Sequence, residues 1–369
     1  MFDVVVIGGN LAGVTAAINA ASKGVSVVLV ERNKEPFDPA HCGELVSDNI
    51  AELLNLDKIG CYKNKINKMI VNVPPREYIF KFKKKGMTIF DRNCVEKKLL
   101  KKAEKEGVEL MLGISMREFK PSHKIFLDND KMIKGRIIID ASGIACQVGR
   151  RIGIDTKLRP EDIGVCIQSR VRSNFDANTI KSWLHNPYAP FGYAWIFPFN
   201  EKIANIGIIV PGGQKLDLAK LLNNYIEEVT EGRYKITNTF RACVPTAPPL
   251  SKLIKGNVMI VGDAARLVYP ESGGGIENAL FSGRLAGMTA AKYIQGESSS
   301  LEIYQQSMHI KILRIRNGYN RKVRAAKSDE KYIRSYQRLF SILCFINKIS
   351  PNLSYIPWMR NLDKLSTKI

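Results

Sequence analysis

Residues 2–31, FDVVVIGGNLAGVTAAINAASKGVSVVLVE, decide the fold of this chain. Residues 2–7 are an apolar run that ends at glycine, which predicts a buried strand. Residues 11–23 carry mostly small side chains and stop at Gly24, which predicts a helix, and residues 25–30 predict a second strand. This order makes a βαβ unit with a parallel pair of strands.

The turn between the first strand and the helix, GGNLAG at residues 8–13, is close to the dinucleotide-binding fingerprint. Gly8 permits the tight turn, Gly13 lets the helix lie close to the strand, and a pyrophosphate sits on the N–H groups at the helix start. Asn10 departs from the glycine pattern, although asparagine tolerates unusual backbone angles. Glu31 ends the second strand, where a carboxylate accepts hydrogen bonds from ribose hydroxyls. The alternative is a glycine turn with a salt-bridged Glu31.

A second combination of strand, glycine, acidic residue and helix lies far downstream. Residues 257–262 predict a buried strand, and Asp263 is placed to accept a hydrogen bond from a ribityl hydroxyl. Gly274 and Gly275 open a helix predicted over 276–295, whose N–H donors and dipole stabilise negative charge on a flavin ring. These positions favour FAD over a nicotinamide cofactor.

The remaining pattern predicts an α/β protein with an α+β insert. A discontinuous Rossmann-type FAD-binding domain is expected over 1–70, 86–155 and 255–300, and a mixed β-sheet substrate domain over 71–85 and 156–254. A C-terminal helical region is expected over 301–369. Further predicted elements are helices over 94–106 and 216–230, strands over 108–112, 136–140, 163–172 and 203–210, and an extended segment over 191–198.

Composition restricts the partners and the compartment. The net charge of +21 suits an anionic membrane surface or an acidic ligand, unless it reflects a lysine-rich coding bias. No zinc-finger spacing or RNA-recognition signature accompanies the charge, so no nucleic acid is expected. Seven cysteines without a C-x-x-C pair argue against a disulfide scaffold and a structural metal site, and favour a reducing cytoplasm. No signal peptide and no spanning segment are expected, which leaves peripheral contact with the inner face of the membrane.

With the turn at 140–143, the two glycine segments resemble the FAD-dependent superfamily related to para-hydroxybenzoate hydroxylase. The resemblance implies a backbone contact near Met116 and a cofactor contact at Arg92, where a surface-capping role for Asp91-Arg92 is the alternative. The other cofactor positions that it implies are Gly8, Gly9, Ala12, Gly13, Glu31, Arg32, Gly262, Asp263, Gly274, Gly275 and Ile276.

Two further segments narrow the family. PAHCGE at 39–44 and YAWIFP at 193–198, with Gly207 eight residues on, look like the geranylgeranyl reductase family, whose signature is Y-x-W-x-F-P, eight residues, then G-x-G. Ile209 replaces the last glycine. The resemblance implies that Cys42 and Gly43 lie close to the flavin. It implies substrate contacts at Tyr193, Trp195, Phe197, Pro198 and Gly207.

The residue types agree with this implication. Tyr193, Trp195 and Phe197 alternate along an extended segment, so they line one face and make an apolar wall that suits a polyprenyl chain. A sheet core is the alternative for these rings, and a buried small residue is the alternative for Cys42. Because an isolated C=C bond is not polarised, its reduction requires a proton donor beside the hydride source. Cys42 is either that acid or a residue that only shapes the pocket.

The resemblance therefore implies an FAD-dependent reductase that saturates geranylgeranyl chains, on membrane glycerophospholipids. Electrons would come from NAD(P)H, ferredoxin or reduced deazaflavin, and the basic surface suits an acidic ferredoxin. Basic residues over 314–327, the apolar segment 339–346 and Trp358 predict a membrane-facing surface, with a helical cap as the alternative. The rival functions are a flavin monooxygenase or halogenase of the same fold and a non-catalytic basic flavoprotein.

Overall fold

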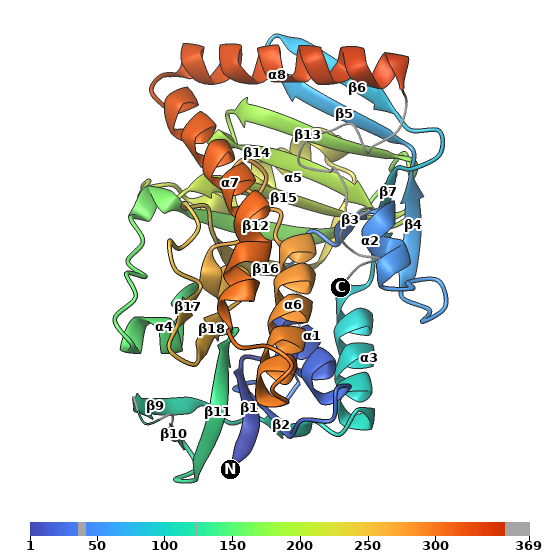
Figure 1. Ribbon diagram of the computed structural model, residues 1–369. Helices are drawn as coiled ribbons and strands as arrows, with labels where there is room; N and C mark the ends of the chain where they lie inside the picture. The colour runs from blue at the N-terminus through green and yellow to red at the C-terminus, as the bar shows by residue number, and fades with distance from the viewer. Residues whose placement is uncertain (36–41, 121, 123, 351–369) are drawn as a thin grey trace. The chain divides into compact units, whose positions relative to one another are not determined.

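The structure is a computed structural model that describes residues 1–35, 42–120, 122 and 124–350. The chain forms two compact units. Figure 1 shows the chain coloured by residue number from the N-terminus to the C-terminus. The first unit comprises Met1–Asp38, Glu96–Leu158 and Val244–Tyr319. The second comprises Pro39–Val95, Arg159–Cys243 and Asn320–Ile369.

This division differs from the predicted domain boundaries. Residues 39–70 and 86–95 belong to the second unit, and the C-terminal segment is shared between both units instead of forming a region of its own. The difference has a physical cause, because long-range strand pairing decides unit membership. Strand β5 (Lys68–Val73), for example, pairs in parallel with β13 (Thr179–Asn186).

The first unit is built on a twisted parallel sheet. Its order is β18-β11-β1-β2-β8, with all four neighbouring pairs parallel, and β17 pairs with β18 in the antiparallel sense at one edge. A β9–β10 hairpin extends β11. The strands are β1 (Phe2–Ile7), β2 (Val27–Glu31), β8 (Glu109–Leu112), β9 (Met116–Lys120), β10 (Lys124–Leu127), β11 (Met132–Asp140), β17 (Ile254–Lys255) and β18 (Val258–Ile260). The predicted Rossmann-type sheet is confirmed.

Helices α1 (Leu11–Ala21) and α6 (Ile276–Ile294) lie side by side in the first unit (Figure 1). A Cβ at Gly283 would lie 2.2 Å from the Ala12 carbonyl oxygen, and a Cβ at Gly287 would lie 2.2 Å from that of Ala16. The small residues of both helices therefore allow their backbones to touch. Other helices are α3 (Arg92–Lys105), α4 (Gln147–Arg151) and α7 (Glu302–Ala325), and short 3₁₀ turns are η1 (Gly143–Ala145) and η3 (Gly262–Ala265).

The second unit holds a seven-stranded sheet in the order β16-β12-β15-β14-β13-β5-β6. Helix α5 (Leu218–Thr230) packs on one face, against inward aliphatic side chains such as Ile167, Ile206 and Ile208. Helix α8 (Asp329–Ile349) runs across β6 and β5 (Figure 1). The strands not yet given are β6 (Arg76–Lys81), β12 (Ile163–Arg172), β14 (Ala189–Pro198), β15 (Ile203–Pro211) and β16 (Lys235–Pro245).

A small sheet in the second unit corrects one expectation about cysteine. Strands β3 (Leu45–Ser47), β7 (Met87–Phe90) and β4 (Tyr62–Ile66) form this sheet beside α2 (Asp48–Leu53), and the short turn η2 (Pro160–Asp162) lies elsewhere in the unit. Because Tyr62 pairs with Phe90, the flanking Cys61 and Cys94 come together, and they form a disulfide with a Cα–Cα distance of 5.5 Å. The expectation of reduced cysteines was wrong for this pair.

Candidate functional site

The predicted fingerprint turn of the first unit is built around two glycines that no other residue could replace without a shift of backbone. Gly8 has a φ of +106°, and a Cβ there would lie 2.3 Å from the Ala141 carbonyl oxygen. A Cβ at Gly13 would lie 1.9 Å from the carbonyl oxygen of Gly8. The turn thus brings β1, α1 and the end of β11 into backbone contact, as the fingerprint requires.

Asn10 has a different role from the one expected. Its backbone is ordinary extended chain, with a φ of −74°, so tolerance of unusual angles is not the reason for asparagine here. Its side-chain oxygen accepts hydrogen bonds from the N–H groups of Ala12 (3.0 Å) and Gly13 (3.3 Å), and its Nδ2 donates to the Ala141 carbonyl. Asn10 is therefore the N-cap of α1, and it occupies two of the N–H donors at the helix start.

Glu31 lies at the end of β2 and is 9% exposed. Its carboxylate accepts hydrogen bonds from the backbone N–H groups of Gly9 and Asn33, both at 2.8 Å. The side chain is thus held directly beside the glycine turn, and each oxygen keeps a lone pair for a further donor. Arg32, the next residue, is exposed.

The second glycine turn lies directly against the first. Gly262 has a φ of +58°, and a Cβ there would lie 2.9 Å from the Cβ of Ala12. Half-buried Asp263 follows in η3, and its Oδ1 would lie 3.2 Å from a Cβ at Gly275. The two glycine turns therefore meet within the first unit.

The start of α6 differs from the start of α1. Gly275 is the N-cap, and because glycine has no side chain, the N-cap residue accepts no hydrogen bond from the N–H groups of the first turn, which begins at Ile276. Gly274 precedes it, and its own N–H donates to the Ser272 hydroxyl. Two turns that tolerate only glycine, a carboxylate on each and one uncapped helix start together fit a dinucleotide such as FAD.

Two other predicted positions have mainly structural surroundings. Met116 begins β9, and its side chain packs in the core with Val5 and Val30. Asp140 is fully buried at the end of β11, where its carboxylate accepts hydrogen bonds from the N–H groups of Val148 and Gly149 at 2.8 Å. Asp140 therefore holds the start of α4 in place.

In the second unit, antiparallel register places three rows of side chains on the sheet face opposite α5. Each row has one residue from β14, one from β15 and one from β12, because directly opposed residues share a face. The rows are Tyr193–Ile209–Cys166, Trp195–Gly207–Gln168 and Phe197–Asn205–Arg170.

The aromatic row (Tyr193, Trp195 and Phe197) lines this face as predicted. Ring centroids of Tyr193 and Trp195 are 5.5 Å apart, and those of Trp195 and Phe197 are 6.0 Å apart with an angle of 27° between the ring planes. Pro198 ends the strand and is buried. Gly207 is also buried, beneath the indole of Trp195, whereas Ile209 fills the next row.

Glu44, which follows Cys42 and Gly43, is held by a buried polar network. It is 3% exposed and has a φ of +60°. One carboxylate oxygen accepts from the backbone N–H of Arg92 at 3.0 Å, and the other accepts from Asn205 Nδ2 at 3.0 Å and from the Arg170 guanidinium. The network joins the Cys42 segment to the start of α3 and to the sheet.

Cys42 has the surroundings of a protonated thiol. Burial raises its pKa above the ordinary value, and the neighbouring Arg92 guanidinium opposes that shift only in part. Its thiol sulfur also accepts a hydrogen bond from the Glu44 N–H at 3.2 Å. Gly43 packs against Phe197, with a Cβ there placed 3.1 Å from the ring. The segment can therefore hold a proton beside the aromatic row.

Replacing Arg170 with methionine is expected to lower the free energy of unfolding by about 3–5 kcal/mol at neutral pH, because Glu44 would be left buried without its cation. Burial raises the pKa of Glu44, so acidification neutralises this carboxyl and the penalty should shrink as the pH falls. Urea unfolding at pH 7 and pH 5 measures both effects. Adding Glu44→Gln should recover part of the loss, and a purely additive double variant would contradict the coupling.

Sequence reasoning missed Glu44, Gln168, Arg170 and Asn205. Gln168 and Arg170 lie on either side of Ser169 in β12, within an otherwise largely apolar strand, and Asn205 interrupts the apolar run of β15. Polar residues at buried positions of a strand pair with one another, so this pattern was the available signal. The partners, however, depend on strand register.

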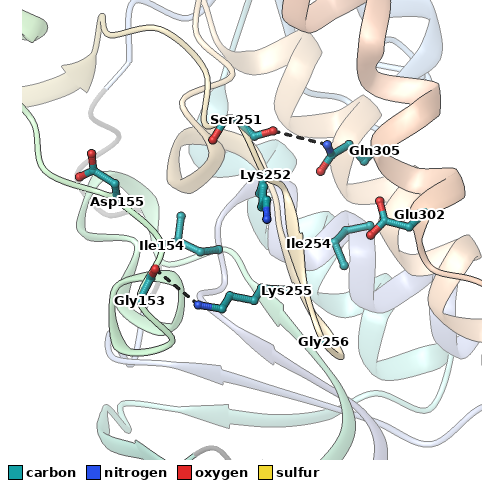
Figure 2. A pocket seen from close by; sticks show the side chains of 10 residues that line it. All are labelled: Gly153, Ile154, Asp155, Ser251, Lys252, Ile254, Lys255, Gly256, Glu302 and Gln305. Carbon is teal, nitrogen blue, oxygen red and sulfur yellow. Dashed lines mark hydrogen bonds between the residues drawn. The ribbon is translucent and has the colours of Figure 1, made fainter.

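A cavity of about 500 Å³ in the first unit is separate from the predicted site residues (Figure 2). Lys255 points across it toward the carbonyl oxygen of Gly153, and Gln305 reaches that of Ser251, so these polar groups satisfy one another. None of the predicted cofactor or substrate positions lines this cavity.

Comparison with known proteins agrees with the description of the glycine turns and of the sheet face. The family model for FAD dependent oxidoreductases matches residues 3–188, and that for the geranylgeranyl reductase catalytic domain matches residues 162–244. The second match contains all three rows of the sheet face.

Curated relatives cover most of the chain. A protein of Methanosarcina acetivorans named digeranylgeranylglycerophospholipid reductase is 32% identical, over 82% of this chain and 78% of its own. Digeranylgeranylglycerophospholipid reductase 1 of Methanococcoides burtonii is 30% identical, over 83% and 78%. The solved structure of a geranylgeranyl bacteriochlorophyll reductase-like protein from Thermoplasma acidophilum shares the fold, with a TM-score of 0.82, 24% identity and coverage of 96% of this chain and 97% of that one. This chain therefore belongs to the geranylgeranyl reductase family of FAD-dependent oxidoreductases.

Proposed function

We propose that this protein saturates the C=C bonds of geranylgeranyl chains carried by glycerophospholipids, with FAD as its cofactor. The observation that carries the proposal is the sheet face of the catalytic-domain match, where the half-buried Cys42 segment adjoins a row of aromatic rings. The names of the archaeal relatives support the lipid class. A monooxygenase or halogenase activity is less favoured, because the matched catalytic domain is that of the reductases.

FAD supplies the hydride for this reaction when it is bound. The residues proposed to hold it in the first unit are Gly8, Gly9, Ala12, Gly13, Glu31, Arg32, Met116, Gly262, Asp263, Gly274, Gly275 and Ile276. Cys42, Gly43 and Arg92 are the proposed cofactor contacts of the second unit. Glu31 and Asp263 would accept hydrogen bonds from hydroxyl groups, and the uncapped start of α6 would donate N–H groups to the flavin.

The aromatic row is the proposed bed of the prenyl chain, with Pro198 at its end and Gly207 beneath Trp195. Rings without charge exclude water and pack against the methyl-branched hydrocarbon of the isoprene units. Cys42 is the proposed proton donor, since the raised pKa of its half-buried thiol keeps it protonated at neutral pH. Because the Glu44 carboxylate pairs with Arg170, the Cys42 segment is fixed to the sheet, and the thiol proton would stay at one place beside the aromatic row.

An anaerobic assay tests the function directly. The purified protein is reduced with dithionite, mixed with geranylgeranyl glycerophospholipid, and the lipid is analysed for chain saturation by mass spectrometry. Saturated chains and reoxidised flavin are expected. An unchanged lipid with the flavin still reduced would contradict the proposal. Repeating the assay with NAD(P)H, a ferredoxin or a reduced deazaflavin in place of dithionite identifies the electron donor.

Helix α8 is the proposed membrane-docking element. Its buried face carries Tyr332, Tyr336, Phe340 and Leu343, whereas Ile342, Phe345 and Ile349 on another face are 60%, 65% and 70% exposed. Exposed Lys331, Arg338 and Lys348 flank that apolar stripe. A helix with an exposed apolar stripe and cations beside it suits an anionic lipid surface.

Two residues of the membrane-facing surface predicted from the sequence are not part of the proposed docking surface. Lys322 is not a free surface cation, because it donates to the Glu161 carbonyl at 3.1 Å and burial lowers its pKa to about 8. Trp358 lies outside the described residues. Within the described ranges, no helix combines the length and apolar character needed to cross a bilayer.

Replacing Ile342, Phe345 and Ile349 together with serine is expected to weaken binding to vesicles containing anionic lipid by about 100-fold, because each side chain would lose about 1 kcal/mol of apolar burial. Co-sedimentation with vesicles measures the binding. Met132→Ser is the matched control, since Met132 is 48% exposed in the first unit. Equal binding of the triple variant and the wild type would contradict the docking role of α8.

A further inference from the structure

The middle row of the sheet face joins two segments that lie far apart in the sequence. Trp195 on β14 and Gln168 on β12 both lie opposite Gly207 on β15, so the three positions form one line across three strands. Trp195 belongs to the aromatic row, whereas Gln168 lies in neither segment that resembles the family signature.

Gly207 allows the indole of Trp195 to lie across the middle strand. A Cβ at Gly207 would be only 2.2 Å from Cζ2 of the indole, and its three nearest neighbours are all atoms of that ring. Because the ring crosses this glycine, its Nε1–H reaches the Gln168 side-chain oxygen at 3.1 Å. A side chain at position 207 would occupy the space that the indole fills.

The other end of Gln168 holds the thiol segment. Its Nε2 donates to the Cys42 carbonyl oxygen at 2.9 Å. Gln168 is 5% exposed and Trp195 is 6% exposed, so water does not compete for either hydrogen bond. The side-chain oxygen of Gln168 accepts from the Trp195 indole N–H and its Nε2 donates to the Cys42 carbonyl, so the two hydrogen bonds fix the orientation of the amide.

We infer that Gln168 is a positioning residue that holds the Cys42 backbone and the Trp195 indole in one fixed arrangement, and that Gly207 provides the space for it. The role of this arrangement in the reaction rests on the proposed function, in which Gln168 sets the position of the Cys42 thiol proton along the prenyl chain. The arrangement itself is measurable without any substrate.

Gln168→Leu removes both hydrogen bonds and keeps a similar volume. The hydrogen of the Trp195 indole N–H is expected to exchange with solvent about five- to tenfold faster than in the wild type. NMR of protein labelled with ¹⁵N-tryptophan measures this exchange, and the Trp195→Phe variant assigns the signal. Cys42 should react several-fold faster with a disulfide reagent active at acidic and neutral pH, followed by peptide mass spectrometry. Exposed Cys243 in the same unit is the internal reference.

Ser169→Ala is the matched control on the same strand. Ser169 is buried on the opposite face and bonds the Thr239 hydroxyl at 2.8 Å, so its replacement also removes one buried hydrogen bond. It should leave the indole exchange and the Cys42 reactivity at their wild-type values. Equal changes in both variants would mean general loosening of the strand and would overturn the positioning role.

Gln168→Glu gives a pH-dependent rescue that a merely structural residue would not produce. A neutral carboxyl group has one donor and one acceptor, so it can make both hydrogen bonds, whereas a carboxylate cannot donate to the Cys42 carbonyl. In the Gln168→Glu variant, Cys42 should react with the disulfide reagent as slowly as in the wild type at pH 5. At pH 8 it should react several-fold faster than in the wild type at the same pH. A ratio to the wild type that does not change with pH would overturn the inference.

Gly207→Ala tests the same arrangement without removing a polar group. The added methyl should displace the indole and reproduce the faster exchange and higher Cys42 reactivity of Gln168→Leu. Unchanged values in Gln168→Leu and Gly207→Ala, with reductase activity present in the wild type, would overturn the positioning role alone. Changed values in a protein that reduces no prenyl lipid would support the positioning role and overturn the proposed function.

Discussion

Replacing Cys42 with alanine is expected to slow saturation of the prenyl chain by about 10²- to 10⁴-fold while FAD stays bound, because the reaction would lose its positioned proton donor. An isolated C=C bond gives a hydride no polarised carbon to attack, so the proton must arrive from a group beside the chain. The Cys42 thiol can hold that proton at neutral pH, since burial raises its pKa above the ordinary value of 9.0. Cys42→Ser should also be slow, because a hydroxyl is a weaker acid than a thiol.

The pH dependence has a definite sign. A proton donor acts in its protonated form, so the rate should hold through neutral pH and fall only as the pH rises above 9.0 toward the raised pKa of Cys42. Single-turnover flavin reoxidation against pH measures this profile. Cys243→Ala is the control, because Cys243 is an exposed free cysteine of the same unit. Wild-type turnover in both Cys42 variants would remove this thiol from the mechanism.

Replacing Gly13 with alanine is expected to weaken FAD binding by at least about 100-fold, equivalent to about 2.7 kcal/mol. The new Cβ would lie 1.9 Å from the Gly8 carbonyl oxygen, and both atoms belong to the main chain or are fixed to it, so no side-chain rotation relieves the contact. The turn must open, and the backbone that would approach the pyrophosphate is then displaced.

Gly24→Ala is the control that separates the general cost of replacing a glycine from the steric contact at Gly13. Gly24 follows the same helix with a φ of +82°, and no atom lies within 4 Å of the place that an added methyl would take, so its replacement costs only the left-handed backbone strain of about 1–2 kcal/mol. Titration of apoprotein with FAD, with far-UV circular dichroism to confirm folding, compares the two variants. A Gly13→Ala protein that binds FAD like the wild type would contradict the proposed role of the fingerprint turn.

The parts that could be predicted from the sequence are the local ones. The glycine turns, the parallel strands beside them and the alternation that puts the aromatic row on one face are all set by neighbours a few residues apart. Hydrophobic period and glycine position carry that information directly. The Rossmann-type unit and the proposed FAD positions therefore followed from the chain alone.

Only the tertiary structure decided which distant side chains meet. Glu44 reaches Arg170 and Asn205, and Gln168 reaches Cys42, because three strands align in one antiparallel register that the sequence does not encode locally. The Cys61–Cys94 disulfide likewise depends on the pairing of β4 with β7. Register is a property of long-range contacts, and a shift of one residue in a strand would turn side chains such as Gln168 and Arg170, or Asn205, to the opposite face.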